Sequence, residues 1–246
     1  MNGLHQIAAV IPLPNVRNWW IYAAITLIFA GFGWAVRGVS RSGALAGAAV
    51  CYGLIVGAGW VGFAALCAVF LLTWAATRVG STHKRSLGTA ESRRGRSALQ
   101  VFANIGVALL CALLYAHWGD QRWLVCLGAA LAEASADTVS SEIGQVLGGV
   151  PRLVTNWKAV IAGTDGAITL AGTLAGAAAA AVVTATCVLG GMFPWRAGLI
   201  CFAAGMLGTV ADSFLGATLE RGGWLGNNAV NFLSTASAAA IAFAFS

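Results

Sequence analysis

Long intervals without a charged side chain decide what this chain can fold into. Five of them occur, at Asn18–Val36, Ser42–Thr77, Ser97–Gly119, Gly166–Trp195 and Gly222–Ser246. A helix needs about 20 apolar residues to cross the hydrocarbon core of a bilayer, and each interval is close to that length or longer. Charged residues make up only 9% of the sequence, whereas a soluble domain carries about a quarter. Lipid must cover most of the surface, so we expect an all-α integral membrane protein.

About eight transmembrane helices account for these intervals and for two shorter ones. The interval from Ser42 to Thr77 is too long for one crossing, and a glycine-rich break at 57–59 divides it into two spans. The predicted spans are residues 19–36, 42–58, 60–77, 98–116, 122–141, 167–189, 196–212 and 229–246. The chain 1–246 then forms a single polytopic domain, with an N-terminal tail (1–18) that shows no signal-peptide pattern.

The segments that connect these spans differ strongly in positive charge. The loops after spans one, three, five and seven carry eleven lysines and arginines, whereas the opposite side carries three. The positive-inside rule places the richer side in the cytosol and both termini outside. The cytosolic side includes a basic loop (78–97) and a second loop (142–166). The membrane is the cell membrane if the source is prokaryotic.

Polar residues that are unusual in membrane helices, together with two glycines of a turn, gather on this predicted cytosolic side. They are Arg96, Gln100, Asn104, Asp137, Glu142, Arg152, Lys158, Gly163, Thr164, Asp165, Gly166, Asp212, Ser213, Asn227, Asn228 and Asn231. Apart from the arginines and the lysine, none of them enters the topology argument. Their convergence at one membrane level therefore predicts a functional site there.

Carboxylates inside membrane helices are costly, at about 2.5–3.5 kcal/mol near the helix centre, so they face protein or water. Five of the eight acids lie in or beside the spans: Glu133, Asp137, Glu142, Asp165 and Asp212. Glu133 and Asp137 share one helix face because they are four residues apart. Asp137 and Glu142 are roughly 140° apart on a continuous helix. They can hold one ion only if the helix breaks near Ser140; otherwise each meets a different partner.

These groups suit Mg²⁺ and phosphate. Oxygen ligands without Cys or His clusters are what Mg²⁺ prefers, and one or two carboxylates plus substrate phosphates usually hold it. The candidate catalytic and metal-binding acids are Asp137, Glu142, Asp165 and Asp212. A glycine turn at Gly163–Gly166 precedes a predicted helix, where backbone amides favour anions. Arg96, Arg152 and Lys158 can neutralise phosphates. The combination is typical of phosphoryl transfer, although no P-loop motif is present.

Each of these features also has a purely structural explanation. Thr164 or Asp165 could cap the following helix. The basic run 78–96 could anchor the protein to anionic lipid, with Arg96 excepted because it adjoins other polar residues. The remaining side chains could cap helices or make buried structural hydrogen bonds: Asn227, Asn228, Asn231, Asp137 and Asp212.

Two weaker patterns concern repetition and packing. Ala136-Asp137-Thr138 is echoed 75 residues later by Ala211-Asp212-Ser213, which suggests a parallel pseudo-repeat in the C-terminal half with the site between its units. Glycines recur at four-residue spacing, as in Gly43/Gly47, Gly53/Gly57 and Gly172/Gly176. Such pairs permit close helix approach within the chain, and they would also permit a homodimer.

Several motifs follow one another in a distinctive order between about Arg37 and Ser234. They are Arg41-Ser-Gly-Ala-Leu-Ala-Gly, Gly95-Arg96 with Gln100-Val-Phe-Ala-Asn104, Ala136-Asp137-Thr138 with Ser141-Glu142-Ile-Gly144, Pro151-Arg152, Gly163-Thr-Asp-Gly166, Asp212-Ser213 with Gly216-Ala-Thr218, and Asn227-Asn228 with Val230-Asn231. In these motifs the chain resembles a membrane family that includes the plant phytyl-phosphate kinase of the vitamin E pathway. Glu220 departs from the family pattern, where a glutamine is expected.

The resemblance implies phosphorylation of an isoprenyl monophosphate to the diphosphate, with Mg²⁺ and with CTP or another nucleoside triphosphate. Arg96, Arg152 and Lys158 would then neutralise the phosphates, while Asn104, Asn228 and Asn231 would orient the acceptor or nucleotide. The rest of the substrate site would be formed by Gln100, Gly163, Thr164, Gly166, Ser213 and Asn227. The expected partners are an isoprenoid lipid phosphate, a nucleoside triphosphate and membrane lipid. Nucleic acid is not expected, because the net charge of +6 reflects a shortage of acids.

Two other functions would use the same groups. A transporter or flippase for a lipid phosphate or small anion needs access from both faces, and Glu133 is the one acid deep enough to serve it. A CTP-dependent lipid-phosphate cytidylyltransferase would use similar metal chemistry but would release pyrophosphate.

Overall fold

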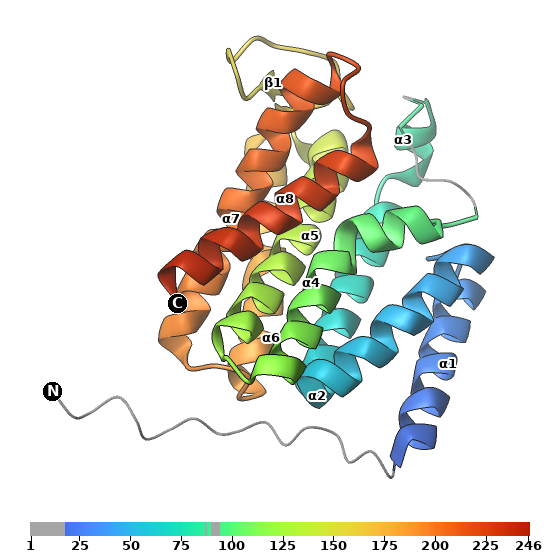
Figure 1. Ribbon diagram of the computed structural model, residues 1–246. Coiled ribbons are helices and arrows are strands. Elements are labelled where there is room, and N and C mark those ends of the chain that lie inside the picture. The colour runs from blue at the N-terminus through green and yellow to red at the C-terminus, as the bar shows by residue number, and fades with distance from the viewer. Residues whose placement is uncertain (1–17, 87, 90–93) are drawn as a thin grey trace, which may run out of the picture.

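The computed structural model describes residues 18–86, 88–89 and 94–246, so the predicted tail up to Arg17, together with Arg93, lies outside the described residues. The described part is a helical bundle (Figure 1). Its helices are α1 (Trp19–Ala35), α2 (Arg41–Arg78), α3 (Ser81–Ser86), α4 (Ala98–Trp118), α5 (Arg122–Leu147), α6 (Leu170–Leu189), α7 (Trp195–Leu215), the π-helix η2 (Gly216–Glu220) and α8 (Asn227–Phe245). Two short strands, β1 (Arg152–Leu153) and β2 (Ala167–Ile168), pair antiparallel. Among the described residues, five helices are long and apolar enough to cross a membrane, which confirms an all-α integral membrane fold.

Helix α2 is a helical hairpin. Gly59 adopts φ 68° and ψ −164°, a conformation open almost exclusively to glycine. The two arms return to the same end of the bundle. Trp74 and Arg78 near the end of α2 donate hydrogen bonds, of 3.3 and 2.6 Å, to the carbonyl oxygen of Val36, which precedes the start of α2. The predicted division into two spans is therefore confirmed.

The helix boundaries differ from the prediction in two places beside the candidate site. Helix α5 continues to Leu147, so part of the predicted loop 142–166 is helical and no break occurs near Ser140. Helix α6 begins at Leu170, because β2 intervenes between the glycine turn and the helix. The hydroxyl of Thr169 caps α6 by accepting a 3.1 Å hydrogen bond from the Gly172 amide. The alternative in which Thr164 or Asp165 caps this helix is wrong.

Helix α5 lies at the centre of the bundle, in contact with α2, α4, α6, α7 and α8 (Figure 1). Its residues 124–136 are all buried. Helix α6 approaches it so closely that a methyl group added at Gly172 would lie 2.6 Å from the Ser140 carbonyl oxygen. Gly57 of α2 faces Ala112 of α4 in the same way. These glycines therefore serve packing within the chain.

The loops predicted to be cytosolic meet at one end of the bundle, which we call the polar end. The backbone at Val39 bridges to Arg96, and Gly80 packs against Val146. Gly166, in the loop between β1 and β2, packs against the α7–η2 junction. The polar end thus brings together segments 36–40, the described part of 79–97, 148–169 and 216–226.

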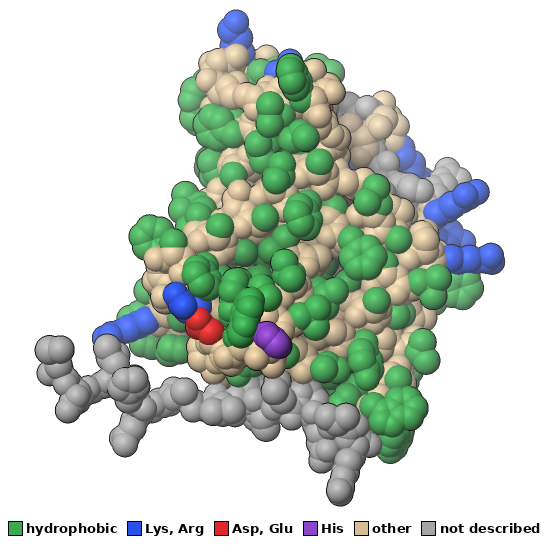
Figure 2. Space-filling view, viewed as in Figure 1, with side chains coloured by type: hydrophobic (Ala, Val, Ile, Leu, Met, Phe, Trp, Pro, Cys, Tyr) green, Lys and Arg blue, Asp and Glu red, His purple; other side chains and the backbone are tan. Residues whose placement is uncertain are grey.

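Apolar side chains cover the face shown in Figure 2, while charged side chains lie near its margins. Large hydrophobic residues are exposed along the sides of the bundle, among them Ile28, Leu45, Leu110, Leu174 and Leu199. A water-facing protein would leave few such residues uncovered in contiguous patches. Lipid is the solvent that suits this surface.

Candidate functional site

Two cavities at the polar end, built from the described residues, lie beside α5. The acidic cavity, of about 470 Å³, is lined by Asp137, Asp165, Asp212 and Glu220 together with the glycine turn. The basic cavity, of about 500 Å³, is lined by Arg37, Arg78, Arg85 and Arg96 above an apolar wall. Consecutive residues of α5 contribute to different cavities, because Asp137 lines the acidic one and Thr138 lines the basic one.

The acidic cavity has a pair of carboxylates from parallel helices at its base. Helices α5 and α7 pack side by side, with Gly205 of α7 against Ala132 of α5. This packing brings the Asp137 and Asp212 side chains to the same level, where both line the acidic cavity. The short sequence echo around these two aspartates therefore corresponds to two equivalent positions in space.

The glycine turn delivers Asp165 to the same cavity. Gly166 has φ +72°, and a Cβ there would collide with the backbone of Ser213 and Ala217. Glycine is the residue that permits both the conformation and the close approach. The turn is closed by hydrogen bonds to the Ile161 carbonyl oxygen, from the Thr164 amide at 3.3 Å and its hydroxyl at 2.8 Å. The acidic cavity also contains four other predicted residues: Gly163, Thr164, Ser213 and Asn227.

Glu220 belongs to the acidic cavity, although its sequence position gave no role for it beyond a departure from the family pattern. It ends the π-helix η2, which follows α7 directly. One turn of π-helix changes the direction in which later side chains point, and such turns are frequent at functional sites. A regular helical projection from Asp212 would have misplaced Glu220. Because the chain has only eight acidic residues, the presence of a glutamate at position 220 could have marked it as a candidate site residue.

The acidic cavity offers carboxylate oxygens, which are the kind of ligand that Mg²⁺ prefers. In the described ranges, no three His, Cys, Asp or Glu side chains are placed to enclose a metal ion by themselves. Mg²⁺ does not require such a cage, since one or two carboxylates with phosphates and water usually hold it. The Oδ2 atom of Asp212 is buried and has no hydrogen-bond partner among the described residues. A buried oxygen of this kind is usually satisfied by an ordered water molecule or an ion.

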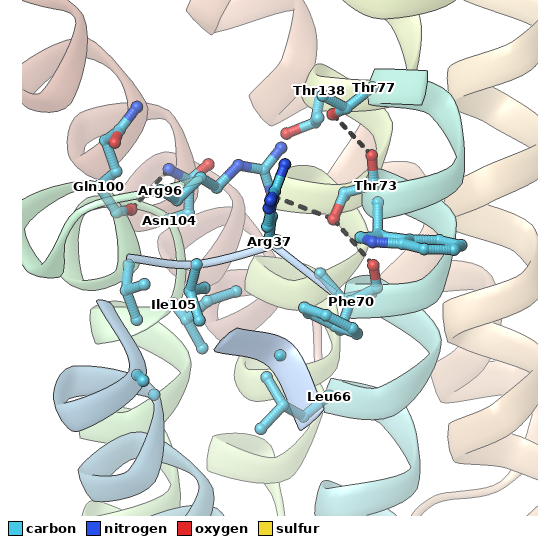
Figure 3. Close-up of a pocket in the computed structure, with 18 of the residues that line it drawn as sticks. Arg37, Leu66, Phe70, Thr73, Thr77, Arg96, Gln100, Asn104, Ile105 and Thr138 are labelled. Atoms are coloured by element: carbon cyan, nitrogen blue, oxygen red, sulfur yellow. Dashed lines mark hydrogen bonds between the residues drawn. The ribbon is translucent and has the colours of Figure 1, made fainter. Parts of the chain in front are cut away.

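The basic cavity takes its fixed geometry from the loop before α4. The Arg96 amide donates to the Gly38 carbonyl oxygen at 3.1 Å, and the Ser40 amide donates to the Arg96 carbonyl oxygen at 3.0 Å. The guanidinium of Arg96 then reaches Thr73 of α2, where Nη1 donates a 3.0 Å hydrogen bond to the hydroxyl (Figure 3). It also interacts electrostatically with Asp137. Arg96 is therefore a lining residue of the basic cavity whose charge also acts on a carboxylate of the acidic cavity.

The predicted polar residues of α4 and α8 are in contact with each other. Gln100 forms a capping box with Ser97 at the start of α4, and its carbonyl oxygen accepts a 2.8 Å hydrogen bond from the Asn104 side chain. The Asn231 amide donates to Asn104 Oδ1 at 3.2 Å. Gln100 and Asn104 line the basic cavity, whereas Asn228 and Asn231 line neither cavity. Asn231 thus holds the Asn104 side chain in place from outside the basic cavity.

Glu142 lies away from both cavities, in an ion pair with Lys84 of α3. The pair is 2.5 Å apart, and the lysine side chain is only 1% exposed. Lys84 Nζ also donates to the carbonyl oxygens of Ala76 and Thr77, at 3.1 and 2.9 Å. Because α5 has no break near Ser140, Glu142 meets a different partner from Asp137, which was the second of the two expected arrangements.

The two bases predicted after α5 lie outside both cavities. Arg152 is exposed on β1 and donates a 2.8 Å hydrogen bond to the Trp157 carbonyl oxygen. Lys158 is exposed in the turn between the strands, with its amide held by the Asn156 side chain at 3.0 Å. Sequence reasoning also used Arg37, Arg78 and Arg85 for topology alone, whereas the structure places all three around the basic cavity.

Fold and site together define a multi-pass helical membrane protein with its polar cavities at one end. The chain belongs to the family described as integral membrane protein DUF92, which matches residues 24–239. This membership confirms the family resemblance carried by the ordered motifs.

Three relatives illustrate the family. The chain is 36% identical over 197 residues to the uncharacterized membrane protein sll0875 of Synechocystis, covering 75% of this chain and 73% of the relative. It is 34% identical over 186 residues to the chloroplastic protein VTE6 of Arabidopsis thaliana, covering 72% and 56%. It is 36% identical over 176 residues to the uncharacterized membrane protein MJ0933 of Methanocaldococcus jannaschii, covering 69% and 70%. No solved structure matches the chain.

Proposed function

We propose that this protein is a Mg²⁺-dependent kinase that converts an isoprenyl monophosphate to the diphosphate, with CTP or another nucleoside triphosphate as donor. The observation that carries the proposal is the placement of Asp137 and Thr138, neighbours in α5 that face cavities of opposite charge. A kinase needs such an arrangement, because a metal–nucleotide and an anionic acceptor must meet at one point. Family membership and the likeness to VTE6 support the same reaction.

The acidic cavity is assigned to the nucleotide and the basic cavity to the acceptor. Asp137, Asp212 and the exposed Asp165 would hold Mg²⁺ directly or through water. Bound Mg²⁺ would neutralise the charge that develops on the transferring phosphoryl group. The amides of the glycine turn, with the side chains of Thr164, Ser213 and Asn227, would donate to nucleotide phosphates. Arg152 and Lys158 would attract the nucleotide from the rim, and the Lys84–Glu142 ion pair would keep α5 in position.

The reaction needs little covalent chemistry from the protein. An oxygen of the lipid phosphate attacks the γ-phosphorus of the nucleotide and forms a new P–O bond. The bond from that phosphorus to the bridging oxygen breaks, and the nucleoside diphosphate leaves with the electron pair. Because a phosphate monoester is already a nucleophile at neutral pH, no dedicated base is required. Rate enhancement comes from positioning and from charge stabilisation by Arg96, whose charge acts on both cavities.

The polar end is assigned to the cytosol. In the sequence, the segments predicted to connect the spans at this end carry eleven lysines and arginines against three on the other side, and this bias normally marks the cytosolic side. Nucleoside triphosphates are available there. The acidic cavity opens among the loops of the polar end, so the nucleotide would reach it from water.

The test is an activity panel with purified protein in detergent. Prenyl monophosphates of several chain lengths are combined with Mg²⁺ and with CTP, ATP, GTP or UTP in turn, and products are followed by mass spectrometry. The expected result is a prenyl diphosphate together with the matching nucleoside diphosphate. Asp137→Asn should remove this product, and Asp120→Asn is the matched control because Asp120 lies at the opposite end of the bundle in an ion pair with Arg122.

Other outcomes of the panel would replace the kinase proposal. A nucleotide-linked lipid with pyrophosphate would make the protein a cytidylyltransferase. Failure of every pair to react would favour transport of a lipid phosphate or small anion. Transport is the weaker alternative, because Glu133 is buried at 1% exposure and lines neither of the two cavities.

A further inference from the structure

The basic cavity is amphiphilic. Its polar side is formed by four arginines and by hydroxyl and amide side chains, whereas its other side is a wall of apolar residues (Figure 3). The wall is made of Phe29, Val50, Leu66, Val69, Phe70 and Ile105, which come from α1, both arms of α2, and α4. No Asp or Glu is among the described residues that line the cavity. Its charge is therefore uncompensated from within, which suits an anion with a long apolar part.

The four arginines are not equally available to such an anion. Arg78 donates a 2.6 Å hydrogen bond to the Val36 carbonyl oxygen and stacks at 4.0 Å on Trp74, and Arg96 donates to Thr73. The guanidinium of Arg37, by contrast, has no hydrogen-bond or ion-pair partner within the described residues. Arg37 also has φ 57°, an unusual conformation for a residue other than glycine. Strained positions of this kind are concentrated at ligand-binding sites.

One wall of the basic cavity is formed by α1, a helix at the periphery of the bundle. Helix α1 packs against α2 and has at most marginal contact with α4, so it stands at the edge of the bundle (Figure 1). The cavity is nevertheless lined by residues of both α1 and α4, such as Phe29 and Val101. The cavity therefore extends from α4, past the first arm of α2, to a peripheral helix that borders lipid.

We propose that the basic cavity binds the phosphate monoester of a long isoprenyl alcohol, which enters from the bilayer beside the peripheral helix α1. The phosphate is held by Arg37 and Arg96, and the chain lies along the apolar wall. The identity of the acceptor rests on the proposed kinase function, whereas the location of its site rests on the cavity. Arg96 then holds the phosphate next to Asp137, where the donor is expected.

A substitution at one glycine can fill the cavity without changing any charge, and a second glycine outside the cavity provides the control. Gly47 of α2 lines the basic cavity, and a Cβ added there would meet nothing within 4 Å. Gly31 of α1 is also surrounded by open space but does not line the cavity. Gly47→Leu should therefore occlude the site, and Gly31→Leu is its matched control. Arg37→Gln and Arg41→Gln form a second pair, because Arg41 is an exposed arginine of the same end that does not line the cavity.

The experiment measures binding without nucleotide or Mg²⁺, so that turnover plays no part. Phytyl monophosphate is titrated into each protein in detergent micelles by calorimetry, with phytol as the uncharged comparison. Loss of a charge-assisted hydrogen bond in Arg37→Gln should weaken binding by about tenfold or more. Gly47→Leu should weaken it at least as much, while Arg41→Gln and Gly31→Leu should remain close to wild type. Phytol should bind far more weakly than its phosphate.

A second measurement uses the wild-type chain and does not depend on how any variant folds. A phytyl monophosphate analogue with a photoreactive group in its chain should label α1, α2 or α4. Labelling confined to α6 and α7, unchanged affinity in both test variants, or no binding of phytyl monophosphate would overturn the proposed site. Binding that depends on Arg37 and Gly47 but leads to no turnover would uphold the site and remove the kinase function. Turnover together with unchanged binding in both test variants would uphold the kinase function and remove the proposed acceptor site.

Discussion

Replacing Lys84 by methionine should destabilise the bundle by about 3–5 kcal/mol, the usual cost of removing one partner from a buried ion pair. The lysine side chain is 1% exposed and that of Glu142 is 12% exposed, so water cannot take over the lost interaction. Lys84→Met leaves the Glu142 carboxylate buried without its cation. It also removes a donor to two carbonyl oxygens near the end of α2, those of Ala76 and Thr77.

The double variant Lys84→Met/Glu142→Gln removes both charges and should be more stable than the sum of the two single changes predicts. We expect a coupling of roughly 1–3 kcal/mol, in the range measured for residues that share one interaction network. The assay is reversible unfolding in mixed micelles at increasing dodecyl sulfate, evaluated as a double-mutant cycle. Arg85→Met is the control, because Arg85 is an exposed cation on the same short helix.

Additive single costs, or a Lys84→Met variant within 1 kcal/mol of wild type, would refute the reasoning for this pair. The cycle also bears on the chemistry of Glu142. A Glu142→Gln variant that keeps its stability and loses turnover would restore Glu142 as a metal ligand. A variant that loses stability in step with Lys84→Met would make it a positioning residue.

Three further predictions concern the acidic cavity. Asp212→Asn, like Asp137→Asn, should lower turnover by roughly a hundredfold or more while the protein still elutes as a folded species on size exclusion; near-normal rates would contradict the assignment of the carboxylate pair. Chelation of divalent cations by EDTA should abolish turnover and added Mg²⁺ should restore it, whereas EDTA-insensitive activity would exclude the metal site. Gly166→Ala should lower the thermal stability more than Gly149→Ala does, and it should also impair turnover. Both glycines have positive φ, but of the two only Gly166 would bring a Cβ against the neighbouring backbone. Gly149→Ala should therefore bear only the conformational cost of about 1–2 kcal/mol. Equal losses of stability in the two variants would contradict the close-packing argument.

Much of the fold could be predicted from the sequence because lipid imposes strict lengths on apolar segments. The interval 42–77 exceeds one crossing, and its glycine-rich break marked the hairpin that Gly59 forms. Asp137 and Asp212 were identified as a pair because carboxylates are rare in membrane helices and because their neighbours resemble each other. The length of apolar segments and the identity of neighbouring residues were sufficient for these predictions.

The parts that escaped prediction depend on contacts between distant residues or on irregular backbone. The ion pair of Lys84 and Glu142 joins positions 58 residues apart, and no local spacing reveals it. Strands β1 and β2 have two residues each, too few for a periodic pattern. Glu220 reaches the acidic cavity through a π-helix, and Arg37 was counted only as a loop charge. Tertiary structure decides each of these cases.

The central claim is that a phosphoryl group passes from a nucleotide in the acidic cavity to a lipid phosphate in the basic cavity. The most direct measurement supplies phytyl monophosphate and CTP labelled with ³²P in either the α or the γ position, and then separates lipid from nucleotide. Label from the γ position should appear in the lipid, and label from the α position should not. Transfer of α label to the lipid, or release of γ label as inorganic phosphate independently of lipid, would contradict the account.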